Sequence, residues 1–489
     1  MIHSRKPVAL LCASALVLTS CSSEGGPSIG GSGEPPRLEM NGDEVVADSN
    51  GTGAEVSARL FDSSDTVVVS SKDRADQLQA AALAVKLGCP MLVRLDGTDE
   101  AVDAEIDRLG AERVINVPGD DQEIAETEPV ASAEAKNDVA AIAQLEPGNR
   151  SELQMPATFV TWETSRAAAA TARAAGAVLH QLSVPDPRET SDSIRMVTEQ
   201  DTLALGLQFG DNENFQARAR LAENGELMGG GGLVFPGRRM IALYGHPYGP
   251  DLGVMGEQPP AEAAALAEEY ASWYQPLTDE PVIPAFEVIA TVASEFPGDD
   301  GNYSNETPME DLVPYVDAIL DAGGYAVIDL QPGQGSFLEQ AKIYEELLKR
   351  PNVGLALDAE WKLNPGEQPL SRIGSATAAE INEVADWLAA IVRDNNLPQK
   401  LFILHQFNVA MFPDRENIVT GQPELAWVLH ADGHGGAEQK FDTWNVLRQD
   451  LDPNFFMAWK NFIDEDSPMF TPEQTYADVN PRPWFVSYQ

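Results

Sequence analysis

Cysteine, basic residues and long apolar runs are all scarce in this 489-residue sequence. Two of the three cysteines, Cys12 and Cys21, lie near the start of the chain, and Cys89 stands alone in the rest of it. This distribution excludes a fold held together by a disulfide framework. Because Cys89 lies in an apolar context, we predict a small buried residue there and not a nucleophile.

Positive charge is also in short supply. The chain has 32 lysines and arginines against 77 aspartates and glutamates, for a net charge of −45. This balance argues against nucleic acid as a partner and against electrostatic adhesion to anionic lipid. Since 43% of the residues are hydrophobic, the chain is long enough to bury more than one core, and we expect at least two domains.

The N-terminus has the pattern of an export signal. A basic segment, Met1–Lys6, precedes an apolar stretch that ends at Leu18 and is too short to span a bilayer well. The next residues, Leu-Thr-Ser-Cys, resemble the bacterial lipobox, which implies cleavage before Cys21 and lipidation of its thiol. We therefore expect a signal peptide at 1–20, a flexible tether at 21–56 and an extracytoplasmic protein held on the cell membrane by its lipid.

Strands and helices alternate through residues 57–225, which predicts a parallel α/β domain. The order strand, helix, strand, helix, strand occurs twice, so we interpret the region as two similar βαβαβ units. The predicted strands are Thr66–Ser70, Pro90–Leu95 and Arg113–Val117 in the first unit, and Thr158–Trp162, Ala177–Leu182 and Thr202–Phe209 in the second.

The first unit resembles a known family on the residues Asp76–Val93 and Ile106–Val117. These segments are similar to cell wall binding repeat 2, which is found in surface proteins of Gram-positive bacteria. The resemblance implies binding to a cell-wall glycan or an anionic wall polymer. A purely structural α/β module remains the alternative, because a fold does not fix a function.

Four consecutive glycines, Gly229–Gly232, predict a linker over 226–238, and residues 239–489 have the pattern of a (β/α)₈ TIM-like barrel. Eight apolar segments are the predicted strands: Met240–Tyr244, Val282–Ile289, Tyr325–Leu330, Val353–Asp358, Lys400–His405, Leu425–His430, Phe455–Lys460 and Trp484–Tyr488. Helices are predicted at Ala261–Tyr274, Met309–Ala322, Ser336–Lys349 and Ala378–Asn395, the last beginning with a capping box at Thr377 and Glu380.

Polar side chains gather at the ends of these apolar strands, which in a barrel form the catalytic face. Asp358 and Glu360 lie two residues apart and so are predicted to point to the same side. The other strand ends supply His246, Glu287, Asp329, His405, Gln406, His430, Asp432, His434 and Lys460. We expect most of these residues to converge on one site.

Three kinds of chemistry suit such a ring of residues. Glycoside cleavage predicts Glu360 as general acid, with Asp358, Glu287 or Asp432 as the partner carboxylate. A metal-dependent hydrolase predicts His430 and His434 as ligands of a divalent metal, together with His405. A site that only binds glycan would use Trp361 as a flat apolar surface, with His246, Asp329, His405, Gln406 and Lys460 as polar contacts.

The region also resembles an uncharacterised glycosidase-like barrel and the C-terminal region of uncharacterised actinobacterial lipoproteins. We therefore predict a cell-envelope lipoprotein that binds wall polymer and carries a glycan-processing site. A non-catalytic binding protein and a metal-dependent hydrolase stay open as alternatives.

Overall fold

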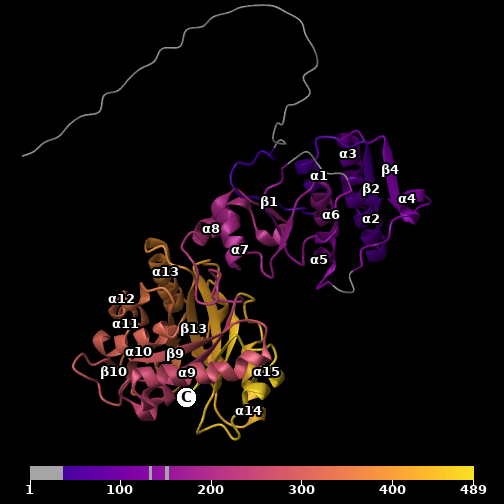
Figure 1. Cartoon of the computed structure of the whole chain (residues 1–489). Coiled ribbons are helices and arrows are strands. Elements are labelled where there is room, and N and C mark those ends of the chain that lie inside the picture. The colour runs from indigo at the N-terminus through magenta and orange to yellow at the C-terminus, as the bar shows by residue number, and fades with distance from the viewer. Residues whose placement is uncertain (1–36, 132–134, 149–153) are drawn as a thin grey trace, which may run out of the picture.

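The computed structural model describes residues 37–131, 135–148 and 154–489. The expected signal peptide and the lipidation site at Cys21 lie outside these residues. Figure 1 shows two folded parts, an N-terminal α/β part in indigo to magenta and a barrel in orange to yellow. Within the described residues, no helix combines the length and apolarity needed to cross a membrane.

The N-terminal part contains two separate parallel sheets. The first has the order β3-β2-β4, and the second has the order β1-β7-β5-β6. The first sheet consists of β2 (Thr66–Ser70), β3 (Met91–Val93) and β4 (Arg113–Val117); the second consists of β1 (Glu44–Val46), β5 (Thr158–Val160), β6 (Leu179–Gln181) and β7 (Leu203–Leu205). All six predicted strands of this region are therefore present, but four are shorter than predicted. The strand predicted over Thr202–Phe209 ends at Leu205 and is followed by a 3₁₀ turn at Leu207–Phe209.

The folded region begins earlier than expected. Residues Glu44–Val46 pair in parallel with Leu203–Leu205, and helix α1 (Ala54–Leu60) follows. The expectation of a flexible tether as far as residue 56 is therefore wrong for this stretch. A three-residue strand in a polar context gives no periodic signal of its own, and only its pairing with β7 identifies it.

Helices cover both sheets, and two of them join the sheets into one core. Helices α2 (Arg74–Leu87) and α6 (Arg166–Ala174) both bury alanine-rich faces in the same apolar cluster. The other helices are α3 (Asp99–Leu109), α4 (Gln122–Ala125), α5 (Asp138–Ala143), α7 (Ser191–Glu199) and α8 (Asn212–Ala222). Cys89 lies in this core, where burial raises the pKa of its thiol to about 12, so the thiol is not a ready nucleophile.

The segment 226–238, predicted as a linker, is folded onto the barrel. Its glycines turn the chain around the buried Arg238, whose guanidinium donates hydrogen bonds to the carbonyls of Gly230, Leu233 and Val234 at 2.6, 3.0 and 3.2 Å. Val234 and Phe235 pack in the apolar cluster that fills the barrel at the end where its strands begin. Gly229, Gly230 and Gly231 have positive φ angles, 91° at Gly230, which glycine adopts more readily than other residues. These glycines therefore allow a tight turn in a folded segment and do not form a flexible linker.

The C-terminal part is a closed barrel of eight parallel strands, as predicted. Its strands follow the order β9-β11-β12-β13-β14-β15-β16-β8, and pairing of β8 with β9 closes the ring. The strands are β8 (Arg239–Gly245), β9 (Val282–Ala293), β11 (Tyr325–Leu330), β12 (Val353–Asp358), β13 (Lys400–Gln406), β14 (Leu425–Ala431), β15 (Phe456–Asn461) and β16 (Phe485–Tyr488). A short strand, β10 (Ser304–Glu306), pairs antiparallel with the end of β9.

Helices surround the barrel unevenly. They are α9 (Pro260–Tyr274), α10 (Met309–Asp321), α11 (Phe337–Ile343), α12 (Glu345–Leu348), α13 (Ala378–Asp394), α14 (Ala437–Leu447) and α15 (Pro472–Asp478). The helix predicted over Ser336–Lys349 is divided at Tyr344 into α11 and α12. Between β13 and β14 the connection contains two short 3₁₀ turns, Val409–Met411 and Arg415–Asn417, in place of an α-helix.

The interior of the barrel changes character along its axis. Apolar side chains such as Met240, Ala285 and Val327 fill the end where the strands begin. Buried charged and polar groups occupy the end where the strands finish. This division places the chemistry of the molecule at the C-terminal ends of the strands, as in other parallel barrels.

Candidate active site

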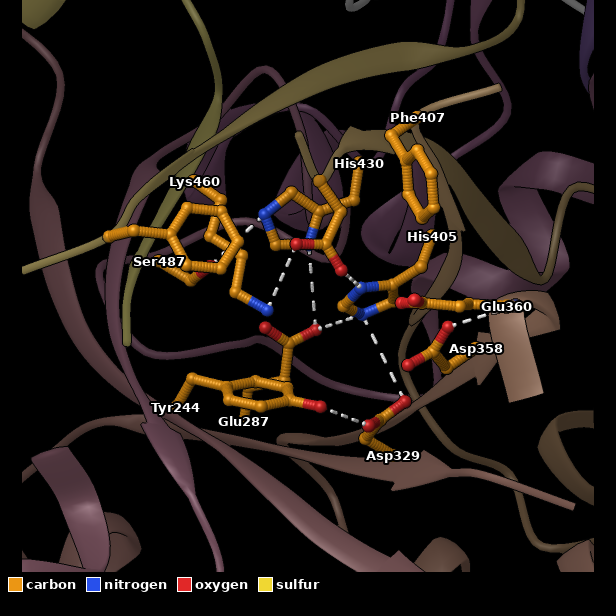
Figure 2. Close-up of polar contacts among 12 residues, drawn as sticks. Tyr244, Glu287, Asp329, Asp358, Glu360, His405, Phe407, His430, Lys460 and Ser487 are labelled. Atoms are coloured by element: carbon orange, nitrogen blue, oxygen red, sulfur yellow. Dashed lines mark hydrogen bonds and ion pairs between the residues drawn. The ribbon is translucent and has the colours of Figure 1, made fainter. Parts of the chain in front are cut away.

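Four fully buried side chains form a layer inside the barrel. Glu287 comes from β9, Asp329 from β11, His405 from β13 and His430 from β14. In the parallel ladders His405 is in register with Asp358 on one side and with His430 on the other, so these strand ends lie at one level. Figure 2 shows the side chains pointing toward one another.

A cavity of about 450 Å³ lies at the mouth of the barrel. Its polar lining includes Asp358, Glu360, Asp432 and Lys460, and its aromatic lining includes Tyr244, Trp361, Phe407 and Phe462. Glu287, Asp329, His405 and His430 are not part of this lining and lie deeper. The site therefore has two levels, an open cavity and a buried polar layer.

His405 connects these two levels. Its Nε2 donates to Glu287 Oε1 at 2.9 Å in the buried layer, and its Nδ1 donates to Asp432 Oδ2 at 2.7 Å in the cavity lining (Figure 2). Burial disfavours a charge on His405, but Glu287 and Asp432 outweigh that effect and raise the pKa of His405 well above its usual value. A charged imidazole shared by two carboxylates holds both in fixed positions.

The carboxyl groups of the cavity have different protonation states. Burial, assisted by the nearby charge of Asp432, raises the pKa of Glu360 to about 7. Burial also opposes ionisation of Asp432, but Lys460 Nζ at 3.1 Å and His405 hold the pKa of Asp432 below its usual value. Burial raises the pKa of Asp358 well above its usual value. Around neutral pH the cavity therefore contains both a carboxylic acid and a carboxylate.

Tyr244 supports this arrangement from β8. Its hydroxyl donates to Asp329 Oδ2 at 2.8 Å, and its ring lies under Lys460, with Nζ 3.7 Å from the ring centroid. Both contacts position charged groups, one by a hydrogen bond and one by a cation–π interaction. Burial raises the pKa of Asp329 to about 6.

Sequence reasoning missed two residues of the site, Tyr244 and Ser487. The Ser487 hydroxyl lies 3.1 Å from His430 Nε2. Both residues lie within segments that were predicted only as apolar strands. Their hydroxyl groups were the one feature of the sequence that could have identified them as site residues. A polar atom in such a strand, directed into the barrel, must find a partner there.

Three predicted site residues lie outside the buried polar layer. His246 is in the loop after β8, and its Nε2 lies 2.8 Å from Thr307 Oγ1. Gln406 follows His405 directly and accepts a hydrogen bond from Arg415 at 2.9 Å. His434 is exposed on the cavity rim, where its ring packs against Phe462 at a centroid distance of 5.7 Å.

The structure does not bring together His430 and His434, the pair predicted to bind metal. His430 is inside the barrel because it lies within β14, whereas His434 lies beyond the end of that strand. The groups able to hold a metal ion are Glu287 with His405 and His430, and Asp358 with His405 and Asp432. Within each group the candidate ligand atoms lie within 4.8 Å of one another.

Comparison of the chain with family models, curated proteins and solved structures gave no match. The chemistry of the cavity and of the layer beneath it is therefore the basis for assigning a function.

Proposed function

We propose that the barrel hydrolyses a glycan, with Glu360 as the general acid and Asp432 as the ionised carboxylate. One observation carries the proposal: two carboxyl groups line the same cavity, and their surroundings move their pKa values in opposite directions. Separated pKa values of this kind distinguish the acid from its ionised partner in glycosidases.

The roles follow from the protonation states. Protonated Glu360 gives its proton to the glycosidic oxygen as the bond between that oxygen and the anomeric carbon breaks. Asp432, held ionised by Lys460, stabilises the positive charge that develops on the sugar ring. A water molecule then supplies hydroxide to the anomeric carbon, and its remaining proton returns to Glu360.

The cavity suits a sugar in size and in lining. A volume of about 450 Å³ falls within the range of small-molecule sites. The aromatic rings of Trp361, Phe407 and Phe462 offer flat surfaces beside the carboxyl groups, and the C–H groups on the face of a sugar ring can pack on such rings.

We further propose that the protein works in the cell envelope of a Gram-positive bacterium as a lipoprotein that binds wall polymer. The lipobox-like residues Leu18–Cys21 support the membrane anchor. The likeness of Asp76–Val117 to cell wall binding repeat 2 supports wall binding. Wall glycan is then the substrate class nearest to the barrel.

The test measures product release from peptidoglycan and arabinogalactan fragments. We expect Glu360→Gln to lower turnover by at least about 10²-fold with little loss of glycan binding, because the amide keeps the shape but has no transferable proton. Asp432→Asn should also lower turnover. Glu339→Gln is the matched control, because Glu339 lies in α11 outside the cavity and is ion-paired with Lys342.

Two outcomes would contradict hydrolysis. One is a wild-type protein that releases nothing from a broad glycan panel, with or without added Zn²⁺, Mn²⁺ or Ca²⁺. The other is full turnover by Glu360→Gln. If wild type binds glycan but releases no product, the non-catalytic binding function replaces the proposal.

A further inference from the structure

We propose that the buried layer beneath the cavity binds one divalent transition-metal ion, with Zn²⁺ as the best fit, between Glu287, His405 and His430. The hydrolysis proposed above uses the cavity residues Glu360 and Asp432 and does not require this ion. The metal site is therefore an additional property of the barrel.

The first support is the convergence of three donor groups from three strands. Glu287 Oε1 lies 2.9 Å from His405 Nε2 and 3.7 Å from His430 Nδ1, and the three candidate ligand atoms lie within 4.8 Å of one another. Donors bound to a tetrahedral Zn²⁺ at about 2.0–2.1 Å are roughly 3.4 Å apart. Small side-chain movements are therefore enough to place these atoms around one ion.

The second support is a set of buried polar atoms that need a partner. Glu287 Oε2, Asp329 Oδ1 and His430 Nδ1 are buried, and within the described residues none of them has a hydrogen-bond partner. All three side chains are fully inaccessible to solvent. Leaving such atoms without partners is unfavourable, and a cation bound to Glu287 Oε1 and the two imidazoles would give His430 Nδ1 the partner it lacks.

The third support is the orientation of the two imidazoles. His405 Nδ1 is fixed by Asp432, and His430 Nε2 lies 3.1 Å from the Ser487 hydroxyl. Each ring thus uses one nitrogen for an outer partner and directs the other nitrogen toward Glu287 (Figure 2). The ion would take the place of the proton that His405 Nε2 donates to Glu287, and this proton would be released to solvent on binding. Metal-binding histidines are commonly held in this way by a carboxylate or another polar group on the far nitrogen.

The donor types select the class of ion. Two imidazole nitrogens with one carboxylate form a nitrogen and oxygen set that suits Zn²⁺ and its first-row neighbours. Ca²⁺ and Mg²⁺ prefer ligand sets made of oxygen alone. His434, exposed on the rim, is not a member of the set.

The experiment titrates the full chain with ZnCl₂ after removal of bound metal by a chelator. Isothermal calorimetry and elemental analysis should both give one Zn²⁺ per chain. Glu287→Gln and His430→Ala should each weaken binding by at least about 100-fold, because each removes a direct ligand. Glu339→Gln, the same substitution as Glu287→Gln on the outside of the barrel, and His434→Ala should leave the affinity unchanged.

Ser487→Ala tests the site if the ligand variants do not fold. This change removes a hydroxyl that orients His430 without touching the ligands, and we expect binding to weaken by about 10-fold or more while circular dichroism stays native. Absence of Zn²⁺ binding to wild type would overturn the proposal. Equal binding by wild type, Glu287→Gln and His430→Ala would also overturn it, and so would loss of binding in His434→Ala.

Metal binding and glycan release are separate readouts. A wild-type protein that binds no Zn²⁺ yet releases product contradicts only the metal site. A protein that binds one Zn²⁺ but releases nothing from any glycan contradicts only the proposed hydrolysis.

Discussion

His405 is the residue on which the polar interior depends. It holds Glu287 below the cavity and Asp432 in the cavity lining, so a change at one level is transmitted directly to the other. Neither carboxylate is stable as an isolated buried charge, since removal of one partner from such a pair leaves the other uncompensated. His405, together with Lys460 beside Asp432, therefore determines how the charges of the site are distributed.

The pKa of Glu360 gives a prediction for the pH dependence of activity. Burial raises this pKa to about 7, and the proposed role of Glu360 requires its proton. Glycan hydrolysis should therefore be highest on the acidic side of pH 7 and decline as the pH rises through about 7. A profile of kcat/KM from pH 5 to pH 9 checks this expectation.

The same profile can contradict the assignment. Activity that increases as the pH rises through 7 would require a group that acts after losing its proton, and Glu360 would then not be the acid. Any residual activity of Glu360→Gln should lack the decline near pH 7, because the titrating group is absent.

Part of this site was predictable from single residues. Asp358 and Glu360 follow an unbroken apolar strand, and that switch in polarity indicated the cavity residues. The sequence could not show which side chains face inward past the end of a strand. Gln406 directly follows His405 but bonds Arg415, and His434 lies beyond β14 on the rim.

Among the elements, the strands of the barrel were predictable because of their environment. They are buried on both faces, so each appears as a continuous apolar run, and β11 and β12 have the predicted limits. The connection between β13 and β14 was less apparent, since short 3₁₀ turns have no amphipathic period. Strand β1 could not be predicted for a similar reason. Its three residues are too few to show a period, and only their pairing with β7 identifies them as a strand.

The capping box of α13 provides a prediction at this scale. The Thr377 side chain accepts a hydrogen bond from the backbone N–H of Glu380, and the Glu380 side chain accepts one from the backbone N–H of Thr377. Thr377→Ala removes half of this exchange and should lower the free energy of unfolding by about 1 kcal/mol. Urea denaturation of the purified protein measures the change.

Thr377→Ser is the control for this substitution. Serine retains the hydroxyl that accepts the hydrogen bond, so its unfolding midpoint should stay close to that of wild type. Equal destabilisation by both substitutions would assign the effect to the lost methyl group and contradict the capping role.

For the whole molecule, the composition correctly indicated more than one core. The prediction of a flexible linker over 226–238 between the two parts was wrong. Four glycines resemble a flexible linker in sequence, yet here the carbonyls of Gly230 and Gly231 accept hydrogen bonds from Arg238 at the end of the barrel where the strands begin. The physical cause is a buried guanidinium that must find several acceptors, and glycine backbones can supply carbonyls in conformations closed to other residues. No local sequence pattern predicts this arrangement of the chain around Arg238.

The proposed anchor is tested at the same scale by Cys21→Ala in a cell-fractionation experiment. Loss of the thiol that accepts the lipid should release the protein from the membrane or block its processing. If the α/β part also binds wall polymer, the released protein should sediment with purified cell walls.

Retention of the Cys21→Ala protein on membranes after a salt wash would contradict the lipid anchor. Sedimentation no greater than that of an unrelated acidic protein would contradict wall binding and leave the α/β part as a structural module.

The two folded parts contact each other at the end of the barrel where its strands begin, so the two ends of the barrel have different surroundings. Arg188 donates to the carbonyl of Pro423 at 2.8 Å, and Asn224 donates to that of Leu397 at 3.0 Å, both just before barrel strands begin. The cavity opens where those two strands of seven residues end, about 20 Å farther along each strand. The α/β part thus contacts the end of the barrel opposite to the mouth of the cavity. If the α/β part binds wall polymer as proposed, the protein would hold one polymer chain at that end and act on a different chain at the mouth of the barrel.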